Sequence, residues 1–149
     1  MDCVDPGAAP IGAIIQRVSE DRVEIARRAL EYFNRGERDA LAELSSPDIE
    51  IVPLRAALEG TVFRGETANA DFWRAIDETW EEIHFEAEEI VESGGKVAIL
   101  GQLRGRARGT DVEVGSPNGW VLTFDGDKVV SLRTYSSHAE ARRAAGLDD

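Results

Sequence analysis

Hydrophobic residues in the first part of the chain recur at the spacing of an α-helix. The apolar stripe of this helix ends at Phe33, and the Asn-Arg-Gly sequence at positions 34–36 is a stop signal. Ser19 is a suitable N-cap, because its side chain can accept a hydrogen bond from the first turn. Residues 1–18, which carry Pro and Gly before any regular pattern, are predicted to be a flexible leader, and residues 19–149 a single domain.

After this helix, apolar and polar residues alternate over one short segment, and the helical spacing of apolar residues then returns. After a short helix around Leu41, the segment Asp48–Pro53 alternates as a strand does, with isoleucines on one face and Glu50 on the other. A further helix is expected to open at Thr67 or Asn69. Its predicted apolar side consists of Phe72, Trp73, Ile76, Trp80 and Ile83.

The second half of the chain consists of β-type runs separated by turn residues. Strands are expected at His84–Val91, Lys96–Arg108, residues 112–124 and Val129–Tyr135, before a short helix at Ala139–Leu147. Gly94-Gly95 and the Asp-Gly-Asp sequence at 125–127 are typical of tight turns. This order, helices first and then antiparallel strands, predicts an α+β domain with helices packed on one face of a curved sheet.

Composition and charge restrict the partners. The chain of 149 residues has a formal net charge of -12, so it would repel nucleic acid. Cys3 is the only cysteine, which excludes an intrachain disulfide, and His84 and His138 lack a third residue at metal-ligand spacing. We therefore expect no metal and no cofactor. The apolar run near the N-terminus is too short to span a bilayer, so we expect a cytoplasmic protein without membrane contact.

Four stretches of the chain together carry a family resemblance. They are "ALEYFNRGERDALAEL", "GTVFRGETA", "ESGGKVAILGQLRGRARGTDVEV" and "FDGDKVVSLRTYSSHAEARRAAGL". Their order and spacing resemble the SnoaL-like group of the nuclear transport factor 2-like (NTF2-like) superfamily, over about residues 19–147. The resemblance implies a conical α+β barrel, in which a curved antiparallel sheet wraps around three helices of the N-terminal half. It also implies a pocket at the open end and a homodimer.

The resemblance does not assign an activity, because this fold supports many functions. Ketosteroid isomerases of the superfamily use a tyrosine, a carboxylate base and a protonated aspartate. The matching positions here are Ala29, Val52 and a position at or beside Trp120, none of which can transfer a proton. The steroid isomerase hypothesis therefore fails.

Two other chemistries of the superfamily need carboxylates. A limonene-type epoxide hydrolase uses two of them bridged by an arginine, but the last strand, residues 128–137, contains none, and Asp111 and Glu113 lie at a predicted turn. A SnoaL-type cyclase needs one carboxylate in an apolar pocket, where desolvation would raise its pKa. Glu50 is the best candidate for that base. The alternative is that Glu50 lies on the solvent face of an alternating strand.

Arg104, Arg106 and Arg108 form a row at every second position of a predicted strand. The resemblance places Leu100, Gln102 and Arg104 on the inner face, where a guanidinium near the pocket mouth could hold a carboxylate or an enolate. The alternative is that the arginines lie on the outer surface and pair with glutamates of the neighbouring strand.

Aromatic and amide side chains complete the candidate pocket. Trp73 and Trp80 have the helical spacing of core residues, and the same helix would also form a pocket wall. Trp120 is expected to face inward, and Asn118 together with Gln102 could orient a carbonyl by hydrogen bonding. The candidate ligand-binding residues are Trp73, Trp80, Leu100, Gln102, Arg104, Asn118 and Trp120.

Two classes of function follow from the sequence. The first is a dimeric domain that binds a small, largely apolar or aromatic molecule bearing a carbonyl or acid group, with a cofactor-independent isomerase or cyclase as its enzymatic form. The second is a non-enzymatic interaction or accessory domain, which the missing ionisable groups at the familiar catalytic positions favour. A filled interior would favour the second class, and an open pocket the first.

Overall fold

The computed structural model describes residues 11–53 and 62–147, with side chains from residue 22 onward. Four helices are present among these residues: α1 (Ile11–Arg35), α2 (Arg38–Glu43), α4 (Ala68–Thr79) and α5 (His138–Ala144). The predicted stripe of α1 is buried, as Ala26 and Phe33 show. Gly36 ends α1 with a φ of 71°, a conformation that side chains other than glycine rarely adopt.

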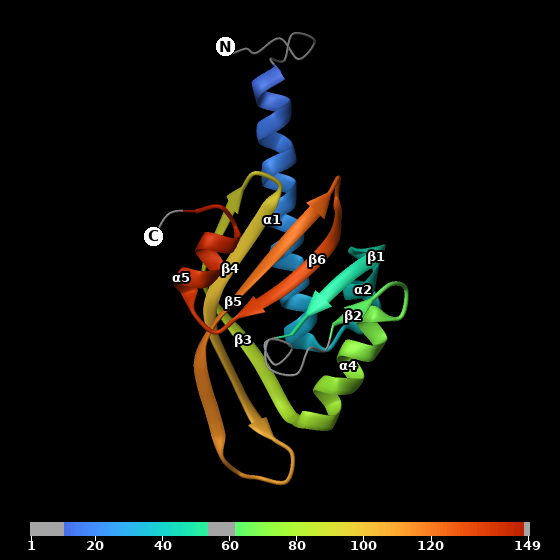
Figure 1. The fold of residues 1–149 in the computed structure, drawn as a ribbon, viewed down its shortest axis with the longest axis vertical. Helices are drawn as coiled ribbons and strands as arrows, with labels where there is room; N and C mark the ends of the chain where they lie inside the picture. Colours follow the sequence, from blue (N-terminus) through green and yellow to red (C-terminus); the bar gives the residue numbers. More distant parts are fainter. Residues whose placement is uncertain (1–10, 54–61, 148–149) are drawn as a thin grey trace.

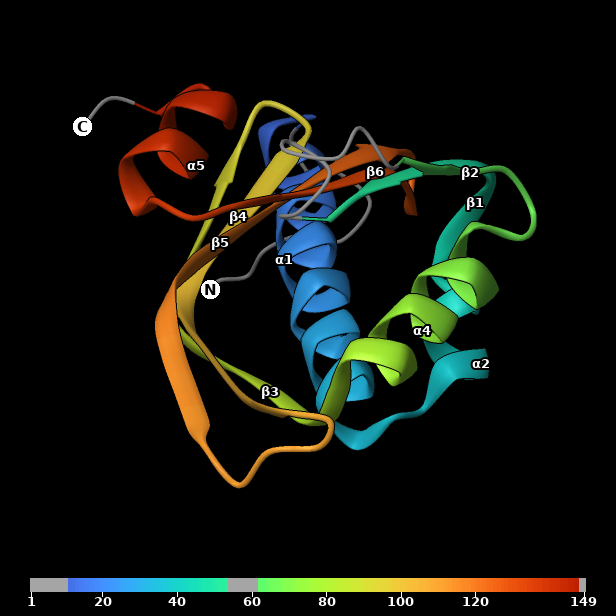
Figure 2. The ribbon, with the colours of Figure 1, turned by 60° about the horizontal axis from the view of Figure 1, so that its bottom comes forward.

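In the part of the chain that the structure describes, six strands form one curved, mixed sheet that does not close into a barrel (Figure 1). They are β1 (Ser45–Val52), β2 (Phe63–Arg64), β3 (Trp80–Ser93), β4 (Lys96–Ala107), β5 (Glu113–Asp125) and β6 (Lys128–Tyr135), in the spatial order β2-β1-β6-β5-β4-β3. Neighbouring strands are antiparallel except for β1 and β6, which are parallel. The three longest strands, β3 to β5, extend beyond β6 and bend strongly (Figure 2).

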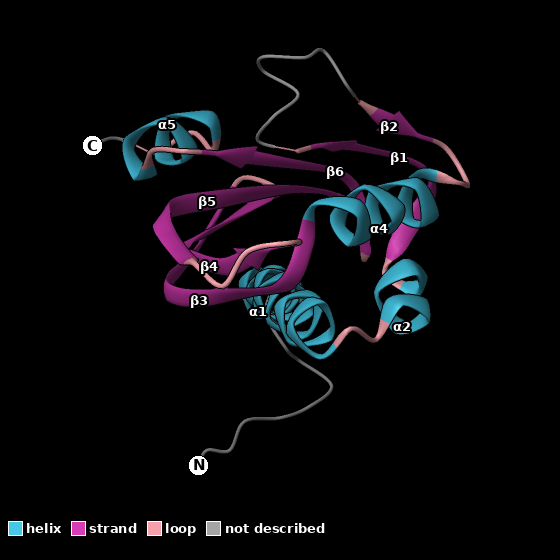
Figure 3. Ribbon diagram, turned by 90° about the horizontal axis from the view of Figure 1, so that it is seen from below, coloured by secondary structure: helices cyan, strands magenta, loops and turns pink. Residues whose placement is uncertain are grey.

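The main core lies on the concave face of the sheet, where α1, α2 and α4 pack (Figure 3). Phe33 of α1, Trp73 of α4 and Trp120 of β5 meet in this core. Ile49 and Ile51 of β1 also point into it, as the alternation in the sequence predicts. The fold is therefore the predicted curved sheet around helices of the N-terminal half.

A second, smaller core lies on the opposite, convex face. There α5 covers Ala98 and Leu100 of β4 and Val121 of β5 through Ala141 and Ala145. The approach is close at Gly119, where an added Cβ would lie 2.6 Å from the Cβ of Ala141. Helices consequently cover both faces of the sheet, which corrects the expectation that they pack on one face only.

Two expected boundaries are wrong. The first helix begins at Ile11, so Ser19 lies inside it and residues 11–18 are helical; positions 1–10 of the predicted leader lie outside the described residues. The other error concerns α4, which ends at Thr79. Trp80 has extended backbone angles and pairs with Ala107, so it opens β3 rather than extending the helix.

The β-rich half otherwise follows the prediction, with one difference in β5. Residues 113–125 form one continuous strand through the Ser-Pro-Asn-Gly sequence, because each residue there has a partner on β4. The sheet is mixed rather than wholly antiparallel, because β1 enters it beside β6 in the parallel direction.

Candidate functional site

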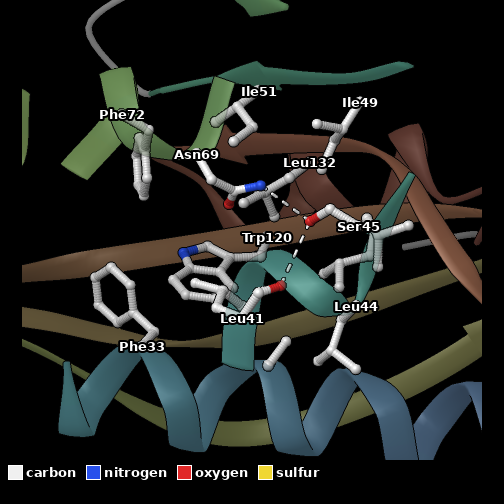
Figure 4. Close-up of a pocket in the computed structure, with 13 residues that line it drawn as sticks. Phe33, Leu41, Leu44, Ser45, Ile49, Ile51, Asn69, Phe72, Trp120 and Leu132 are labelled. Atoms are coloured by element: carbon white, nitrogen blue, oxygen red, sulfur yellow. Dashed lines mark hydrogen bonds between the residues drawn. The ribbon is translucent and has the colours of Figure 1, made fainter. Parts of the chain in front are cut away.

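A small cavity lies between the concave face of the sheet and the helices α1, α2 and α4 (Figure 4). Its volume is about 30 Å³, which is enough room for one or two water molecules. The lining is almost entirely apolar. The residues that line it are Ala29, Phe33, Leu41, Leu44, Ser45, Ile49, Ile51, Asn69, Phe72, Trp120, Leu122, Val129 and Leu132.

Two polar side chains of the lining are hydrogen-bonded to each other. Asn69 Nδ2 donates to Ser45 Oγ over 3.2 Å, and Ser45 Oγ donates to the carbonyl oxygen of Leu41 over 3.5 Å (Figure 4). Asn69 lies in the first turns of α4, and Ser45 is the first residue of β1. This short chain of hydrogen bonds joins α4, β1 and α2 at the cavity wall.

Stacked and edge-on aromatic rings border the cavity. The ring of Phe33 stacks on Trp73 with a centroid distance of 5.3 Å and meets Trp120 edge-on at 5.0 Å. Trp120 in turn meets Phe85 edge-on at 4.8 Å. Stacked and edge-on arrangements at these distances are the favourable geometries for aromatic pairs, so these contacts stabilise the wall.

Buried polar atoms without partners lie in the same aromatic region. Asn118 is 1% exposed, and neither its Nδ2 nor its Oδ1 has a hydrogen-bond partner. The indole nitrogen of Trp73 is buried and unpartnered as well. Such atoms are uncommon in folded proteins, because each forgoes its hydrogen bonds to water.

An ion pair joins α2 to α4 beside this wall. Arg38 donates to both carboxylate oxygens of Asp77, at 2.8 Å and 2.6 Å, and its guanidinium lies 4.6 Å from the ring centre of Trp73. The hydrogen bonds from Arg38 lower the pKa of Asp77 below its usual value, and those to Asp77 raise the pKa of Arg38. Arg108 adds a hydrogen bond to the backbone oxygen of Asp77.

Glu50, the candidate base, lies on the face of β1 opposite the cavity-lining isoleucines. Its carboxylate receives hydrogen bonds from Arg64 on β2, at 3.1 Å, and from Arg133 on β6, at 3.2 Å. Its side chain is 29% exposed. The structure therefore gives Glu50 two cationic partners on the sheet surface and not a desolvated position inside the cavity.

The arginine row faces outward and pairs with glutamates of β3. Arg104 binds Glu86 at 2.6 Å, Arg106 binds Glu82 at 2.7 Å, and Arg108 lies 3.5 Å from Glu81. The hydrogen bond that Arg104 donates to Glu86 raises the pKa of Arg104, whose side chain is half exposed. The expectation that Arg104 lies on the inner face is therefore wrong, and cross-strand pairing accounts for the row.

Other predicted residues divide between the two faces. Leu100 lies on the convex face beneath α5, and Gln102 shares that face because it alternates with the inward Leu103. Both expectations of an inner position are thus wrong. Trp80 packs at Gly105, where an added Cβ would lie 2.8 Å from its ring, and it is absent from the cavity lining.

Three predicted residues, Trp73, Asn118 and Trp120, do lie on the concave side, and only Trp120 lines the cavity. Two lining residues, Ser45 and Asn69, were not predicted from the sequence as site residues. Both are common helix-end residues, and only the packing of α4 against the start of β1 brings them into hydrogen-bonding distance. Helical spacing could have identified Asn69 as a neighbour of Phe72. No pattern in the sequence indicates that Ser45 is the hydrogen-bond partner of Asn69.

The fold is that of a ketosteroid isomerase-like, or NTF2-like, domain. A model of the SnoaL-like domain family matches residues 26–132. The chain therefore belongs to the SnoaL-like domain family. No curated protein matches it.

Solved structures support the same fold at low sequence identity. An NTF2-like protein of unknown function from Burkholderia pseudomallei is 20% identical with a TM-score of 0.71, over 83% of this chain and 95% of that one. A protein of ketosteroid isomerase-like fold from Catenulispora acidiphila, solved with trimethylamine, is 20% identical with a TM-score of 0.68, over 83% and 93%. A putative SnoaL-like polyketide cyclase from Jannaschia is 16% identical with a TM-score of 0.69, over 89% and 96%.

Within residues 11–53 and 62–147, no helix is both long and apolar enough to cross a membrane. The same part of the chain contains no group of three or more His, Cys, Asp or Glu residues placed to hold a metal ion.

Proposed function

We propose that this SnoaL-like domain binds a small, largely apolar molecule in the cavity between α1, α2, α4 and the sheet. The observation that carries the proposal is the lining itself. Apolar and aromatic side chains surround one hydrogen-bonded polar pair, Asn69 and Ser45, which is the usual composition of a small-molecule site. Two of the structural neighbours bear the name putative polyketide cyclase, which implies a small-molecule substrate. The shared fold favours that class of ligand here.

The cavity must widen to admit such a molecule. Its volume of about 30 Å³ is far below the roughly 300 Å³ or more of typical ligand pockets. The wall formed by α2 is the one best able to move, because none of its residues is buried. The ion pair between Arg38 and Asp77 and the contacts of Leu41 hold this short helix in place. We infer that outward movement of α2 enlarges the cavity.

Binding is favoured over catalysis in this cavity. A cyclase or isomerase needs an acid or base in contact with the ligand. None of the thirteen described lining residues is ionisable. Glu50 would serve as a base only for a ligand on the opposite face of β1, where two arginines already bind it. A variant Glu50→Gln is therefore expected to bind ligand as the wild type does.

Filling the cavity tests the proposal. Ala29 is buried and lines the cavity, so Ala29→Val places two methyl groups into the space a ligand would use. Thermal melting would be recorded with indole, acetophenone and benzoic acid, since a ligand that binds only the folded state raises the melting temperature. We expect a rise for at least one compound in the wild type and none in Ala29→Val.

The matched control is Ala26→Val, the same change one turn earlier on α1 at a buried position outside the cavity lining. It is expected to lower the melting temperature of the free protein but to keep the ligand-induced rise. Absence of any rise in the wild type, or an equal rise in Ala29→Val, would refute binding in this cavity.

A non-enzymatic interaction domain is the second candidate function. Val112 and Val114, at the end of the bent β4–β5 ribbon, are 65% and 48% exposed. Large apolar side chains exposed together are typical of contact surfaces. The candidate partner is a second copy of the chain, as in the homodimer that the family resemblance implies.

A further inference from the structure

The most unusual interior group of the described chain is the side-chain amide of Asn118. The residue is 1% exposed, and both ends of its amide lack a hydrogen-bond partner. Burying an amide without partners costs free energy, because its hydrogen bonds to water are lost and not replaced, so the free protein is destabilised by this side chain. An apolar residue of similar size would avoid that cost.

The neighbours of Asn118 explain why it has no partner. Its partner across the ladder is Gly101, which has no side chain, and an added Cβ there would lie 1.9 Å from the backbone oxygen of Glu86 and 2.8 Å from Cε1 of Phe85. Trp120 follows on the same face of β5 and contacts Phe85. No side chain at the cross-strand position can therefore bind the amide, and both of its ends lack a hydrogen-bond partner.

Another asparagine, the half-buried Asn34, shows what a satisfied amide does. Asn34 donates from Nδ2 to the backbone oxygen of Phe85 over 2.9 Å and accepts from the backbone nitrogen of Phe85 over 2.9 Å. It therefore binds a donor and an acceptor that lie side by side. Asn118 presents the same pair of atoms with nothing bound to them.

Asn118 is also close to the proposed binding cavity. It lies two residues from Trp120, which lines that cavity, and the two side chains leave the same face of β5 about 7 Å apart along the strand. Asn118 is the first residue of β5 beyond its pairing with β6, which ends at the Gly119–Tyr135 pair. A ligand with an aromatic body beside Trp120 would therefore place its end at Asn118.

We infer that Asn118 is the polar anchor of the binding site, and that it selects ligands whose end carries a neutral hydrogen-bond donor and acceptor side by side. A carboxamide or an undissociated carboxylic acid has this arrangement. An ionised carboxylate would lose its hydration without gaining a counter-charge, because Asn118 is neutral. The inference rests on the proposed function, since it assumes that the adjoining cavity receives the ligand.

The first test compares the same substitution at the two asparagines. Asn118→Leu removes an amide without partners, so we expect its melting temperature to rise above that of the wild type. Asn34→Leu removes two hydrogen bonds to Phe85 and is expected to lower it. A fall for Asn118→Leu as large as that for Asn34→Leu would show that its amide is satisfied within the free protein, and the inference would be overturned.

The second test measures affinity for benzamide and for ethylbenzene by ligand-observed NMR. Benzamide carries the donor–acceptor pair, and ethylbenzene is a match of similar size without it. We expect Asn118→Leu to bind benzamide about tenfold more weakly than the wild type, the loss expected for about two hydrogen bonds, and to bind ethylbenzene at least as tightly.

The outcomes separate the two proposals. If ethylbenzene binds the wild type and benzamide binds both proteins equally, the anchor role is wrong and the cavity function stands. If neither compound binds the wild type, the cavity function fails and the anchor role fails with it. If Asn118→Leu loses about tenfold in affinity for benzamide and none for ethylbenzene, the result supports both the cavity function and the anchor role.

Discussion

At the scale of single residues, arginines of this acidic protein form ion pairs with nearby carboxylates. Arg104 and Arg106 each pair with a glutamate of the adjacent strand, and Arg38 binds Asp77 with two hydrogen bonds. Exposed pairs of this kind individually contribute little to stability, because solvent screens them. The pair between Arg38 and Asp77 differs in holding two helices together and in lying over the ring of Trp73.

The lowered pKa of Asp77 makes this pair sensitive to acid. Because the folded state binds a proton less readily than the unfolded state, the pair stabilises the protein above the unfolded pKa of about 3.9. That contribution is lost as the pH falls from there through the folded pKa. Urea unfolding of wild type and Asp77→Asn should show the wild type more stable at pH 7, and a smaller difference at pH 3. An unchanged difference at pH 3 would contradict this.

At the scale of elements, β4 requires glycine at positions 101 and 105, where the backbone of β3 lies very close to it. An added Cβ at Gly101 would lie 1.9 Å from the backbone oxygen of Glu86, opposite the irregularity between Ala87 and Glu89. Backbone atoms cannot move aside as a flexible side chain can. The bend of the β3–β4 ribbon over Phe85 therefore requires glycine at this position.

Substitution of Gly101 on β4 and of Gly115 on the neighbouring strand β5 tests this requirement. We expect Gly101→Ala to lower the free energy of unfolding by about 3 kcal/mol or more, in the upper range for overpacked sites. Gly115→Ala is the matched control on β5, because its nearest neighbour would lie 3.7 Å from the added Cβ, an ordinary contact. Denaturant unfolding measures both. Similar losses in the two variants would show that the close approach at Gly101 is unimportant.

At the scale of the whole molecule, the curved sheet has two covered regions and one exposed end. The helices α1, α2 and α4 fill the concave face, and α5 covers part of the convex face. The ribbon of β4 and β5 extends past β6 and carries the exposed Val112 and Val114 at its end. This end is the surface on which the interaction hypothesis depends.

Light scattering after size exclusion tests whether that surface joins two copies. We expect the wild type to elute as a dimer, and the double variant Val112→Asp with Val114→Asp as a monomer, because two buried carboxylates would oppose association. Glu113→Gln, between the two valines, is the control and should remain dimeric. A monomeric wild type, or a dimeric double variant, would contradict a role for this end of the ribbon.

Much of the fold could be predicted from the sequence, because local patterns determine local structure. The stripe that includes Phe33 formed the buried side of α1, and the alternation of Ile49 and Ile51 gave β1 its inner face. The prediction failed at Trp80, whose helical spacing continued the stripe of α4 into β3. Side chains that face one core can keep a helical spacing across a change of element, so periodicity alone placed the boundary wrongly.

The candidate site was less predictable, for a physical reason that β4 illustrates. Val97, Ala98, Ile99 and Leu100 are all buried, because helices cover both faces of the sheet there. A strand buried on both faces has no alternation from which its inner side can be read. The sequence by itself determined the elements, their order and the family. Only the tertiary structure decided that Arg104 faces solvent, that Ser45 meets Asn69, and that Asn118 is buried without a partner, because each depends on neighbours distant in the chain.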